Sequence, residues 1–415
     1  MAKGLKLDQF KEPAFSANIL CIQPKKIYIN SVHENLQEKK DFKSEFLPGK
    51  KFNKGDVVTY KLIEDVADKY NSIKVYSYGD YTVKDIKYLI DENEHAESFI
   101  VIEAENELST DLDFFYNDNN FTNSLIQNKS IDDIINLAYK ASIIDETDGE
   151  YLFKKFLKLN EVFLNNGKIY IDAIDDQPYT SSKEAILLHY PNAIDLAVKA
   201  IKNAFKTEKI DIIFYDVESY NREIKIPKKC GDIDIIKIKG NYPVRHNIKN
   251  KLKYNYFIGI QSMLHLARVL LNNEYKQTTT FITVAGNAVK NPKNIEVPIG
   301  TPVEEIINEF LLNCEPKRII LGQAITGISV TDVDIPVSAT TRSVLLFSDY
   351  VVSKKMECIG CAKCADVCPQ NLLPSYRNKF KETGDKNFKE FSSEFKCIKC
   401  YCCTYICPSH IDLVN

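Results

Sequence analysis

The sequence predicts a multidomain protein of the α/β and β classes, with four units in order along the chain. Three observations support this prediction. Apolar and polar residues alternate around turn signals near residues 15–90, and strand-like and helix-like stretches alternate between residues 91 and 250. Nine of the 12 cysteines follow residue 357, where they form two runs of the same design. The remaining segment, residues 251–345, has the pattern of a hairpin followed by one helix.

Composition narrows the class of protein. The chain has 415 residues, of which 44% are hydrophobic and 27% charged, as in globular proteins of two to four domains. We find neither an apolar run of transmembrane length nor the apolar core of a signal peptide, so we expect a cytoplasmic protein. In that reducing compartment cysteines are metal ligands or free thiols rather than disulfides. A net charge of −3 gives no indication of nucleic-acid binding.

The first unit, assigned to residues 1–90, is expected to be a small β structure. Its apolar–polar alternation is interrupted by turn signals at Gly49 and at Gly55–Asp56. No cluster of reactive side chains accompanies the pattern, so we interpret this unit as a scaffold.

The second unit, residues 91–250, is expected to contain a mainly parallel sheet. Strands are predicted at 98–108, 168–176 and 209–217, and helices at 130–144 and 192–205. Such sheets bind ligands beyond the carboxyl ends of their strands. The acidic residues expected there could hold ribose hydroxyls or simply face solvent, and the pattern leaves both readings open: Glu103, Glu105, Glu107, Asp175 and Asp176.

The third unit, residues 251–345, is expected to be a β-grasp fold, a hairpin packed on one helix. Within 279–310 a β-run leads to Gly286, a turn follows, and a second β-run precedes an amphipathic helix from Val303. A further strand and a loop bracketed by Gly322 and Gly327 complete the pattern.

The fourth unit, residues 346–415, contains both cysteine runs, each spaced C-x2-C-x2-C-x3-C-P. Three thiolates at this spacing can wrap one [4Fe–4S] cubane, while the fourth cysteine is carried away by a short helix. In two-cluster ferredoxins the fourth thiolate ligates the other cluster. We therefore predict two [4Fe–4S] clusters, the first held by Cys358, Cys361, Cys364 and Cys407. The second is held by Cys397, Cys400, Cys403 and Cys368.

Alternatives to this assignment fit less well. A structural zinc site prefers two separated C-x2-C pairs, which these runs do not resemble. Cys402 is a ninth cysteine that breaks no spacing, and we interpret it as a spare thiol. The isolated cysteines are expected to be small buried residues: Cys21, Cys230 and Cys314. Residues 371–396 are expected to form a helical insert, and four apolar residues are expected to shield the cubanes: Ile359, Val367, Ile398 and Ile406.

Several of these segments resemble a known family. The stretches "FITVAGNAVKNPKNIEVPIGTPVEEII" (281–307) and "EPKRIILGQAITGISVTDVDIPV" (315–337), with both cysteine runs, resemble the C subunit of the Rnf electron-transport complex, RnfC. The resemblance extends over roughly residues 15–415 and is strong after Phe257. It implies a barrel-sandwich-like N-terminal unit, an α/β domain like the NADH-oxidising flavin subunit of complex I, a soluble-ligand-binding β-grasp (SLBB) domain and a double-cluster ferredoxin. In this family NADH gives a hydride to FMN, and electrons leave singly through the clusters.

The sequence departs from the family around the nucleotide. The family's N-terminal Gly-rich segment is missing from 6–20, and its acidic flavin loop corresponds to 102–110 without the usual glycine and proline. The family's Gly-Gly-Glu after Tyr242 and Pro243 is replaced by "VRH". Phosphates bind best where no side chain covers the backbone N–H groups. The resemblance thus implies an altered FMN and NADH site, whose candidate residues are Glu103, Glu105, Glu107, Tyr242 and Arg245.

Three functions follow as hypotheses. The first is an iron–sulfur electron-transfer protein that relays electrons to a partner reductase, such as the proline reductase that relatives of this family serve. The second is the NADH-oxidising C subunit of a membrane-associated Rnf complex, attached peripherally at the inner face of the membrane. A scaffold with zinc or degenerate cluster sites is the third, and the complete set of eight ligand positions disfavours it. No catalytic residue is assigned.

Overall fold

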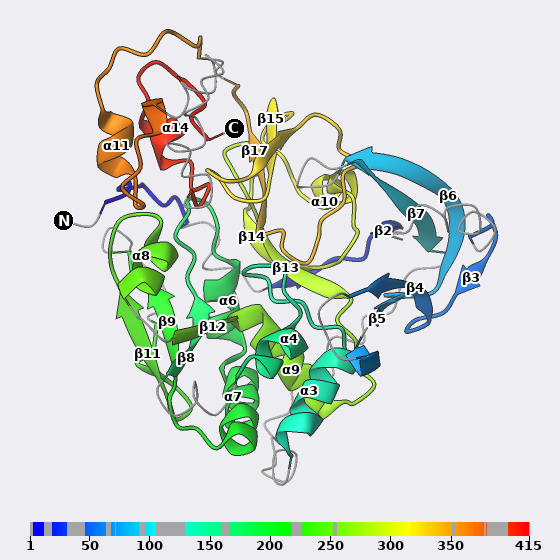
Figure 1. Cartoon of the computed structure of the whole chain (residues 1–415). Coiled ribbons are helices and arrows are strands. Elements are labelled where there is room, and N and C mark those ends of the chain that lie inside the picture. The colour runs from blue at the N-terminus through cyan, green and yellow to red at the C-terminus, as the bar shows by residue number, and fades with distance from the viewer. Residues whose placement is uncertain are drawn as a thin grey trace.

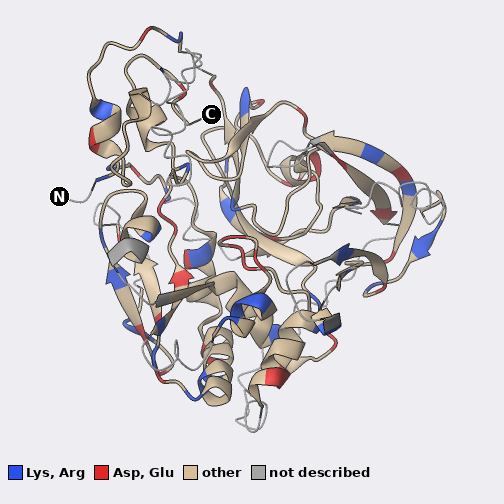
Figure 2. Ribbon diagram, viewed as in Figure 1, with Lys and Arg blue, Asp and Glu red and all other residues tan. Residues whose placement is uncertain are grey.

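The chain forms several groups of strands and helices, which Figure 1 shows from the blue N-terminus to the red C-terminus. The computed structural model describes residues 3–11, 19–30, 46–63, 68–70, 72–90, 96–104, 129–159, 167–217, 226–251, 255–350, 353–376, 379 and 397–414. Lysine and arginine are interspersed with aspartate and glutamate along the ribbon (Figure 2), as expected for a net charge of −3.

The N-terminal unit is built from an antiparallel sheet of order β2-β7-β6-β3 and a separate hairpin, β4–β5. The strands are β2 (Lys26–Asn30), β3 (Lys51–Phe52), β4 (Val57–Leu62), β5 (Ser72–Tyr76), β6 (Tyr81–Ile90) and β7 (Ala96–Ala104), with a short 3-10 helix, η1 (Asp68–Tyr70). The sheet buries one apolar cluster that includes Ile27, Phe52 and Val83. The prediction of a β unit is confirmed for these described strands.

The strand predicted at 98–108 lies in a different sheet from the one expected. Its described part is β7, which pairs antiparallel with β2 and β6 rather than with the parallel strands. Ile100 and Ile102 face one apolar cluster, and Phe99 and Val101 face another. A strand buried on both faces reads as one continuous apolar run, the same signal that a central parallel strand gives. The expectation of a parallel strand here was wrong for that reason.

The second unit contains a five-stranded sheet of order β10-β11-β9-β8-β12, in which the last four strands are parallel. The strands are β8 (Lys168–Ala173), β9 (Ile210–Tyr215), β10 (Lys229–Cys230), β11 (Ile233–Ile238) and β12 (Asn255–Gly259). The helices are α3 (Ile131–Lys140), α4 (Leu152–Leu157), α6 (Ser182–His189), α7 (Pro191–Phe205), α8 (Val244–Lys251) and α9 (Ile260–Leu271). The predicted parallel sheet is confirmed, although β12 extends it past residue 250.

Local chemistry explains why these helices form. Ser130 caps α3, because its hydroxyl accepts from the backbone N–H of Asp133 while the Asp133 carboxylate accepts from the N–H of Ser130. In α7 an apolar stripe that includes Ile194, Val198 and Ile201 is fully buried in the main core. Cys230 also lies in that core, as predicted for an isolated cysteine. Cys21 is half-buried, and the prediction was wrong for Cys314, which is exposed.

The strand order fixes where a ligand site would lie. From β8 the chain adds β9 and then β11 on one side, and it crosses back to place β12 on the other side. The order therefore reverses between β8 and β12, and in open α/β sheets ligands bind beyond the carboxyl ends of the strands at such a point. The segments after Ala173 and after Gly259 thus mark the expected crevice.

The third unit is a six-stranded sheet of order β1-β14-β13-β17-β15-β16. Its strands are β1 (Leu20–Cys21), β13 (Thr279–Ala285), β14 (Lys293–Pro298), β15 (Arg318–Leu321), β16 (Ile328–Val330) and β17 (Ser343–Phe347). Helix α10 (Val303–Asn308) buries Val303 and Ile306 against this sheet. The predicted hairpin and following helix are confirmed as β13, β14 and α10. The predicted limits of the units themselves stay a prediction.

The C-terminal unit has two one-turn helices, α11 (Lys363–Val367) and α14 (Cys402–Ile406), which contact each other. Figure 1 shows them beyond α8, near both chain ends. Most of the predicted helical insert at 371–396 lies outside the described residues. In the part of the chain that the structure describes, no helix has the length and apolarity needed to span a membrane.

Candidate functional site

Cysteines from both runs line a first pocket in the C-terminal unit. Ile359, Ile411 and Leu413 form part of its apolar wall. We call this pocket the outer site, and its cysteines are Cys358, Cys361, Cys364 and Cys407. Three of them come from the first run and one from the second.

A second pocket has the reciprocal composition. Leu372, Leu373 and Leu413 contribute apolar wall. We call it the inner site, and its ligand-spaced cysteines are Cys368, Cys397, Cys400 and Cys403. The grouping of cysteines in the two pockets matches the two predicted ligand sets. The role of each cysteine as an iron ligand stays a prediction.

The two short helices produce this exchange of the fourth cysteine. Ala362 and Tyr401 adopt left-handed backbone conformations, with φ of 59° and 57°, and each turns the chain into a helix of five residues. Cys368 and Cys407 follow directly as extended residues at the helix ends. Because each helix carries its last cysteine one turn away from the other three, that thiol reaches the pocket of the opposite run.

The arrangement differs from that of a single-ion site. Among the residues that the structure describes, no group of three or more His, Cys, Asp and Glu side chains is placed to hold one metal ion. A cubane makes a different demand, since each of its four irons takes its own thiolate. Each of the two pockets is lined by four ligand-spaced cysteines, which is the number of thiolates that one cubane takes.

The two sites differ in their exposure. At the outer site Cys358 and Cys361 are exposed, and Ile359 is 70% exposed. At the inner site Cys368 and Cys403 are buried. Ile359 and Ile398 line the pockets, although they are 70% and 36% exposed, so their role in shielding the sites stays a prediction. Val367 and Ile406 pack instead against the cluster formed by Leu5, Tyr242 and Cys402.

The inner site is attached to the α/β unit by hydrogen bonds around Tyr242. The Tyr242 hydroxyl donates to the carbonyl oxygen of Cys400 at 3.1 Å. The Cys402 thiol donates to the carbonyl oxygen of Tyr242, with an S···O distance of 3.8 Å. Leu5 exchanges two backbone hydrogen bonds with Tyr242, of 2.9 and 2.8 Å, and closes the contact from the N-terminal side. Tyr242 was a candidate flavin residue, and the structure places it against the cysteine loop.

The thiols of the inner site have shifted pKa values. A hydrogen bond from the Cys402 side chain lowers the pKa of Cys400 to about 7, and the same contact raises that of Cys402. Burial raises the pKa of Cys403 to about 12. Metal ligands must be deprotonated, so iron binding at Cys403 has to displace a proton that burial retains.

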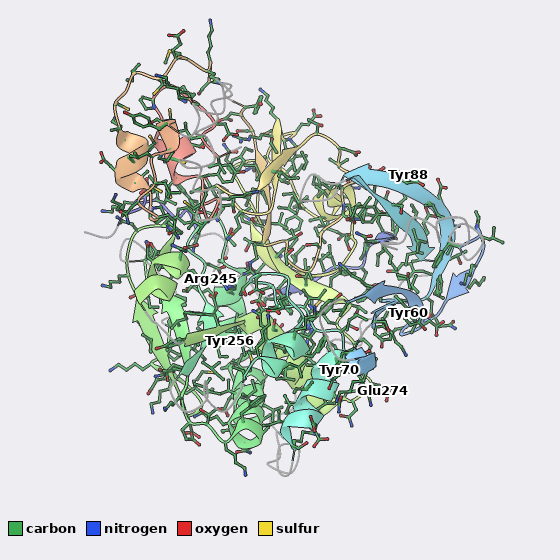
Figure 3. All side chains as sticks on the ribbon, viewed as in Figure 1. Tyr60, Tyr70, Tyr88, Arg245, Tyr256 and Glu274 are labelled. Carbon is green, nitrogen blue, oxygen red and sulfur yellow. The ribbon has the colours of Figure 1, made fainter. Side chains whose placement is uncertain are left out.

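At the carboxyl end of β8 the charged residues pair with one another. The Asp172 carboxylate lies 3.2 Å from the Lys183 ammonium and 2.5 Å from Nε of Arg245. Burial would raise the pKa of Asp172, but Lys183 and Arg245 outweigh burial and lower it to about 2. Arg245 also donates to the Thr147 carbonyl oxygen at 3.2 Å. Two nitrogens of the candidate phosphate ligand Arg245, labelled in Figure 3, are therefore engaged by the chain itself, whereas the buried Nη2 has no hydrogen-bond partner among the described residues.

The two acidic residues after β8 are also used internally. Asp175 accepts from the backbone N–H groups of Lys183 and Glu184 at 2.9 and 3.1 Å, and it lies 3.3 Å from the Arg342 guanidinium. Asp176 accepts from the backbone N–H of Val244 at 2.7 Å, and burial raises its pKa. Both side chains are buried, so neither of the two readings of the pattern, ribose ligand or solvated carboxylate, describes their contacts in this structure.

Glu146 occupies the other half of the crevice, and the sequence did not single it out. Its carboxylate accepts from the backbone N–H groups of Gln261 and Ser262 at 3.1 and 3.2 Å, and from the Ser262 hydroxyl. A Cβ atom at Gly259 would lie 2.1 Å from the Glu146 carboxylate, so only glycine permits this approach. The carboxylate thus sits at the N-terminus of α9, where an anionic ligand would otherwise bind. The acidic stretch 145–150 was the available signal.

The remaining candidate flavin residues do not join this cluster. Glu103 lies on β7, 3.7 Å from Lys84, and Figure 1 shows β7 on the opposite side of the molecule from α8, the helix that contains Arg245. Glu105 and Glu107 lie outside the described residues.

A separate cavity of about 310 Å³ lies beside α8. Its lining residues include Tyr170, Ile238 and Asn241.

Comparison with known proteins identifies two domains of the chain. The family model of the SLBB domain matches residues 281–310, and that of the 4Fe-4S dicluster domain matches residues 357–411. The C subunit of the ion-translocating oxidoreductase complex of Buchnera aphidicola subsp. Baizongia pistaciae is 24% identical over 58% of this chain and 51% of its own length. The corresponding C subunit of Vibrio cholerae is 26% identical over 49% of this chain and 29% of its own length.

A third relative is the C subunit of the Na(+)-translocating ferredoxin:NAD(+) oxidoreductase complex of Acetobacterium woodii. It is 34% identical over 23% of this chain and 22% of its own length. The chain thus spans about half, or less, of these relatives. Among solved structures, an NAD+-reducing [NiFe]-hydrogenase aligns with 63% of this chain and 54% of its own, at 12% identity and a TM-score of 0.43. The sequence relatives and the two matched domains show that the chain is RnfC-like, a relative of the C subunit of ion-translocating oxidoreductase complexes with an SLBB domain and a 4Fe-4S dicluster domain.

Proposed function

We propose that the chain is an iron–sulfur electron-transfer protein that relays electrons through two [4Fe–4S] clusters to a protein redox partner. The observation that supports this proposal most directly is the composition of the two pockets. Each gathers the first three ligand-spaced cysteines of one run and the last cysteine of the other, with Cys402 as a further cysteine in the inner pocket, and the match to the dicluster family model covers both runs. Such an arrangement serves two neighbouring cubanes.

The donor sets fit the group they would hold. The outer ligands are Cys358, Cys361, Cys364 and Cys407, and the inner ligands are Cys368, Cys397, Cys400 and Cys403. When bound, a cubane supplies one-electron redox chemistry. The protein contributes the rest: Leu413 separates the two pockets as part of both walls, and the exposed Cys358 and Cys361 leave an edge of the outer site open for a partner.

We further propose that the FMN and NADH site of the family is altered in this chain. At the reversal of the sheet, Arg245 pairs with Asp172, and Glu146 takes the N–H groups at the start of α9. A phosphate bound beside Arg245 or at the start of α9 would lie next to the carboxylate of Asp172 or of Glu146. Like charges in contact repel each other. These contacts support a relay that receives its electrons from a protein rather than from bound NADH.

The partner is the less defined part of the proposal. A dedicated reductase such as proline reductase is one candidate, and in that case the chain would act in the cytoplasm. The second candidate is a membrane-associated Rnf complex, with the chain bound peripherally as its NADH-oxidising C subunit. The sequence relatives are consistent with membership of such a complex, since three are named as subunits of ion- or sodium-translocating complexes.

One anaerobic preparation separates the possibilities. The relay predicts about eight iron atoms and eight sulfide ions per chain, and flavin far below one per chain. Stoichiometric FMN, together with reduction of the clusters by NADH, would instead establish the NADH-oxidising function. A colourless protein that contains zinc would contradict both functions.

A further inference from the structure

The contact between Tyr242 and the cysteine loop joins the inner site to the rest of the molecule. Two hydrogen bonds run in opposite directions across it, from the Tyr242 hydroxyl to the Cys400 carbonyl oxygen and from the Cys402 thiol to the Tyr242 carbonyl oxygen. Cys402 is fully buried, and Tyr242 is 4% exposed. The Cys402 thiol also lies beside the side chain of Cys400, an inner-site ligand in the proposed assignment, and this contact lowers the pKa of Cys400. We call these two residues, Tyr242 and Cys402, the junction.

The two cysteine runs differ at this position. Cys402 directly precedes the third cysteine of its run, and the corresponding residue of the first run is Lys363. Lys363 is exposed, whereas Cys402 has no exposed surface. The chain therefore places a buried S–H donor beside one site and a solvated ammonium beside the other. The two runs share their cysteine spacing, so this side chain is one of the differences that can give the two sites different properties.

Burial and hydrogen bonding act in opposite directions on a cluster. Reduction adds negative charge, so a buried site with few polar neighbours is harder to reduce, whereas donors aimed at the ligand sulfurs make reduction easier. Cys403 and Cys368 are buried, and this surrounding disfavours added charge at the inner site. The Cys402 thiol is a donor held by the Tyr242 carbonyl oxygen and lies beside Cys400, so a hydrogen bond from it to the Cys400 sulfur would offset that effect.

We propose that the junction is a positioning element for the inner cluster: Tyr242 holds the Cys400 loop against the α/β unit, and the Cys402 thiol donates to Cys400 and raises the reduction potential of the inner cluster. Neither residue is a ligand. The inference depends on the proposed function, because it requires that a cluster occupy the inner site. It goes beyond that function by assigning a role to the ninth cysteine and to Tyr242.

The test is a redox titration of the full-length chain, prepared anaerobically and followed by electron paramagnetic resonance. The variants are Cys402→Ala, Cys402→Ser and Tyr242→Phe, with Lys363→Ala as the matched control in the first run. Iron is counted in every sample. The signal that is lost in Cys361→Ser identifies the outer cluster, so the other signal reports on the inner one.

We expect Cys402→Ala to keep about eight irons and to lower the potential of the inner cluster alone. A tenfold change in its reduced-to-oxidised ratio at fixed potential corresponds to about 59 mV for one electron. Cys402→Ser retains an O–H donor and should shift the potential less, and Tyr242→Phe should shift it in the same direction. Lys363→Ala should leave the inner potential unchanged. Retention of the inner cluster in the serine variant but not in the alanine variant would also support a positioning role.

Two results would overturn the inference. If Cys402→Ala keeps all its irons and the reduction potential of its inner cluster is unchanged, the Cys402 thiol has no effect on that potential. Loss of the inner cluster in both the alanine and the serine variant would make Cys402 itself a ligand. Far fewer than about eight irons in the unchanged chain would contradict the proposed function and, with it, the inference.

Discussion

The cysteine pockets and the reversal point of the parallel sheet are opposite kinds of site. In the pockets, nine cysteines line two hollows together with apolar side chains such as Ile411, Leu372 and Leu413. At the sheet reversal, carboxylates already pair with cations and with the N–H groups of a helix. The first region is arranged to receive a group from outside. The second satisfies its own charges, and for this reason we propose that the chain has kept its electron-carrying sites while its nucleotide site is altered.

The largest expected effect lies at the outer site. We expect Cys361→Ser to remove the outer cluster, lowering the iron content from about eight to about four atoms per chain and stopping electron transfer. The inner cluster should remain, because its four cysteines are unchanged. Iron analysis and electron paramagnetic resonance check this result. Two fully occupied clusters in the variant would show that the ligand assignment is wrong.

The next effect tests the closed region. Asp172→Asn should lower the free energy of unfolding by about 3–5 kcal/mol, since the buried Lys183 ammonium and the half-buried Arg245 guanidinium lose their shared carboxylate partner. Urea unfolding measures this change. The exposed pair Lys229 and Asp234 provides the control, and Asp234→Asn should change stability by less than about 0.5 kcal/mol. Equal effects of the two variants would contradict the account of a self-paired cluster.

A third change asks whether Glu146 fills an anion site. Glu146→Ala frees the N–H groups of Gln261 and Ser262 and should cost about 1–3 kcal/mol. Inorganic phosphate should then raise the melting temperature of the variant, because an anion can replace the carboxylate at the start of α9. The unchanged chain should show no such dependence. If phosphate does not change the melting temperature of the variant, something other than the Glu146 carboxylate keeps anions out of the crevice.

The smallest effect concerns acid. The pKa of Asp172 is lowered to about 2 in the folded chain from an ordinary value of 3.8, so its contribution to stability is fully present above that ordinary value. Stability from this group should therefore fall as the pH drops from about 4 to about 2. Unfolding measured at several pH values in this window should show a shallower decline in Asp172→Asn than in the unchanged chain. An identical decline in the variant and the unchanged chain would mean that another group causes the loss of stability at acid pH.

Local patterns predicted the parts of the structure that local spacing determines. The cysteine runs, the β13–β14 hairpin with α10, and the stripe of α7 depend on residues close in sequence, so their periodicity was enough. Local pattern could not predict which sheet β7 joins. A strand that is apolar on both faces has the same pattern in an antiparallel as in a parallel sheet. Pattern also could not reveal the contact of Glu146 with Gln261, since their sequence separation of 115 residues leaves no local signal.

The same reasoning explains what was missed in the candidate site. Arg245 and Tyr242 were selected for their place in a family motif, yet their partners come from distant segments, Asp172 and Cys400. Cys402 was interpreted as a spare thiol because its spacing fits no ligand pattern, and only its burial against Tyr242 indicates a role.

The measurement that tests the central claim most directly is the iron and acid-labile sulfide content of the full-length chain, prepared without oxygen. The account predicts about eight of each per chain, with both clusters lost in a variant that lacks Cys368 and Cys407, the two exchanged cysteines. Far fewer than eight irons, or zinc in their place, would contradict it.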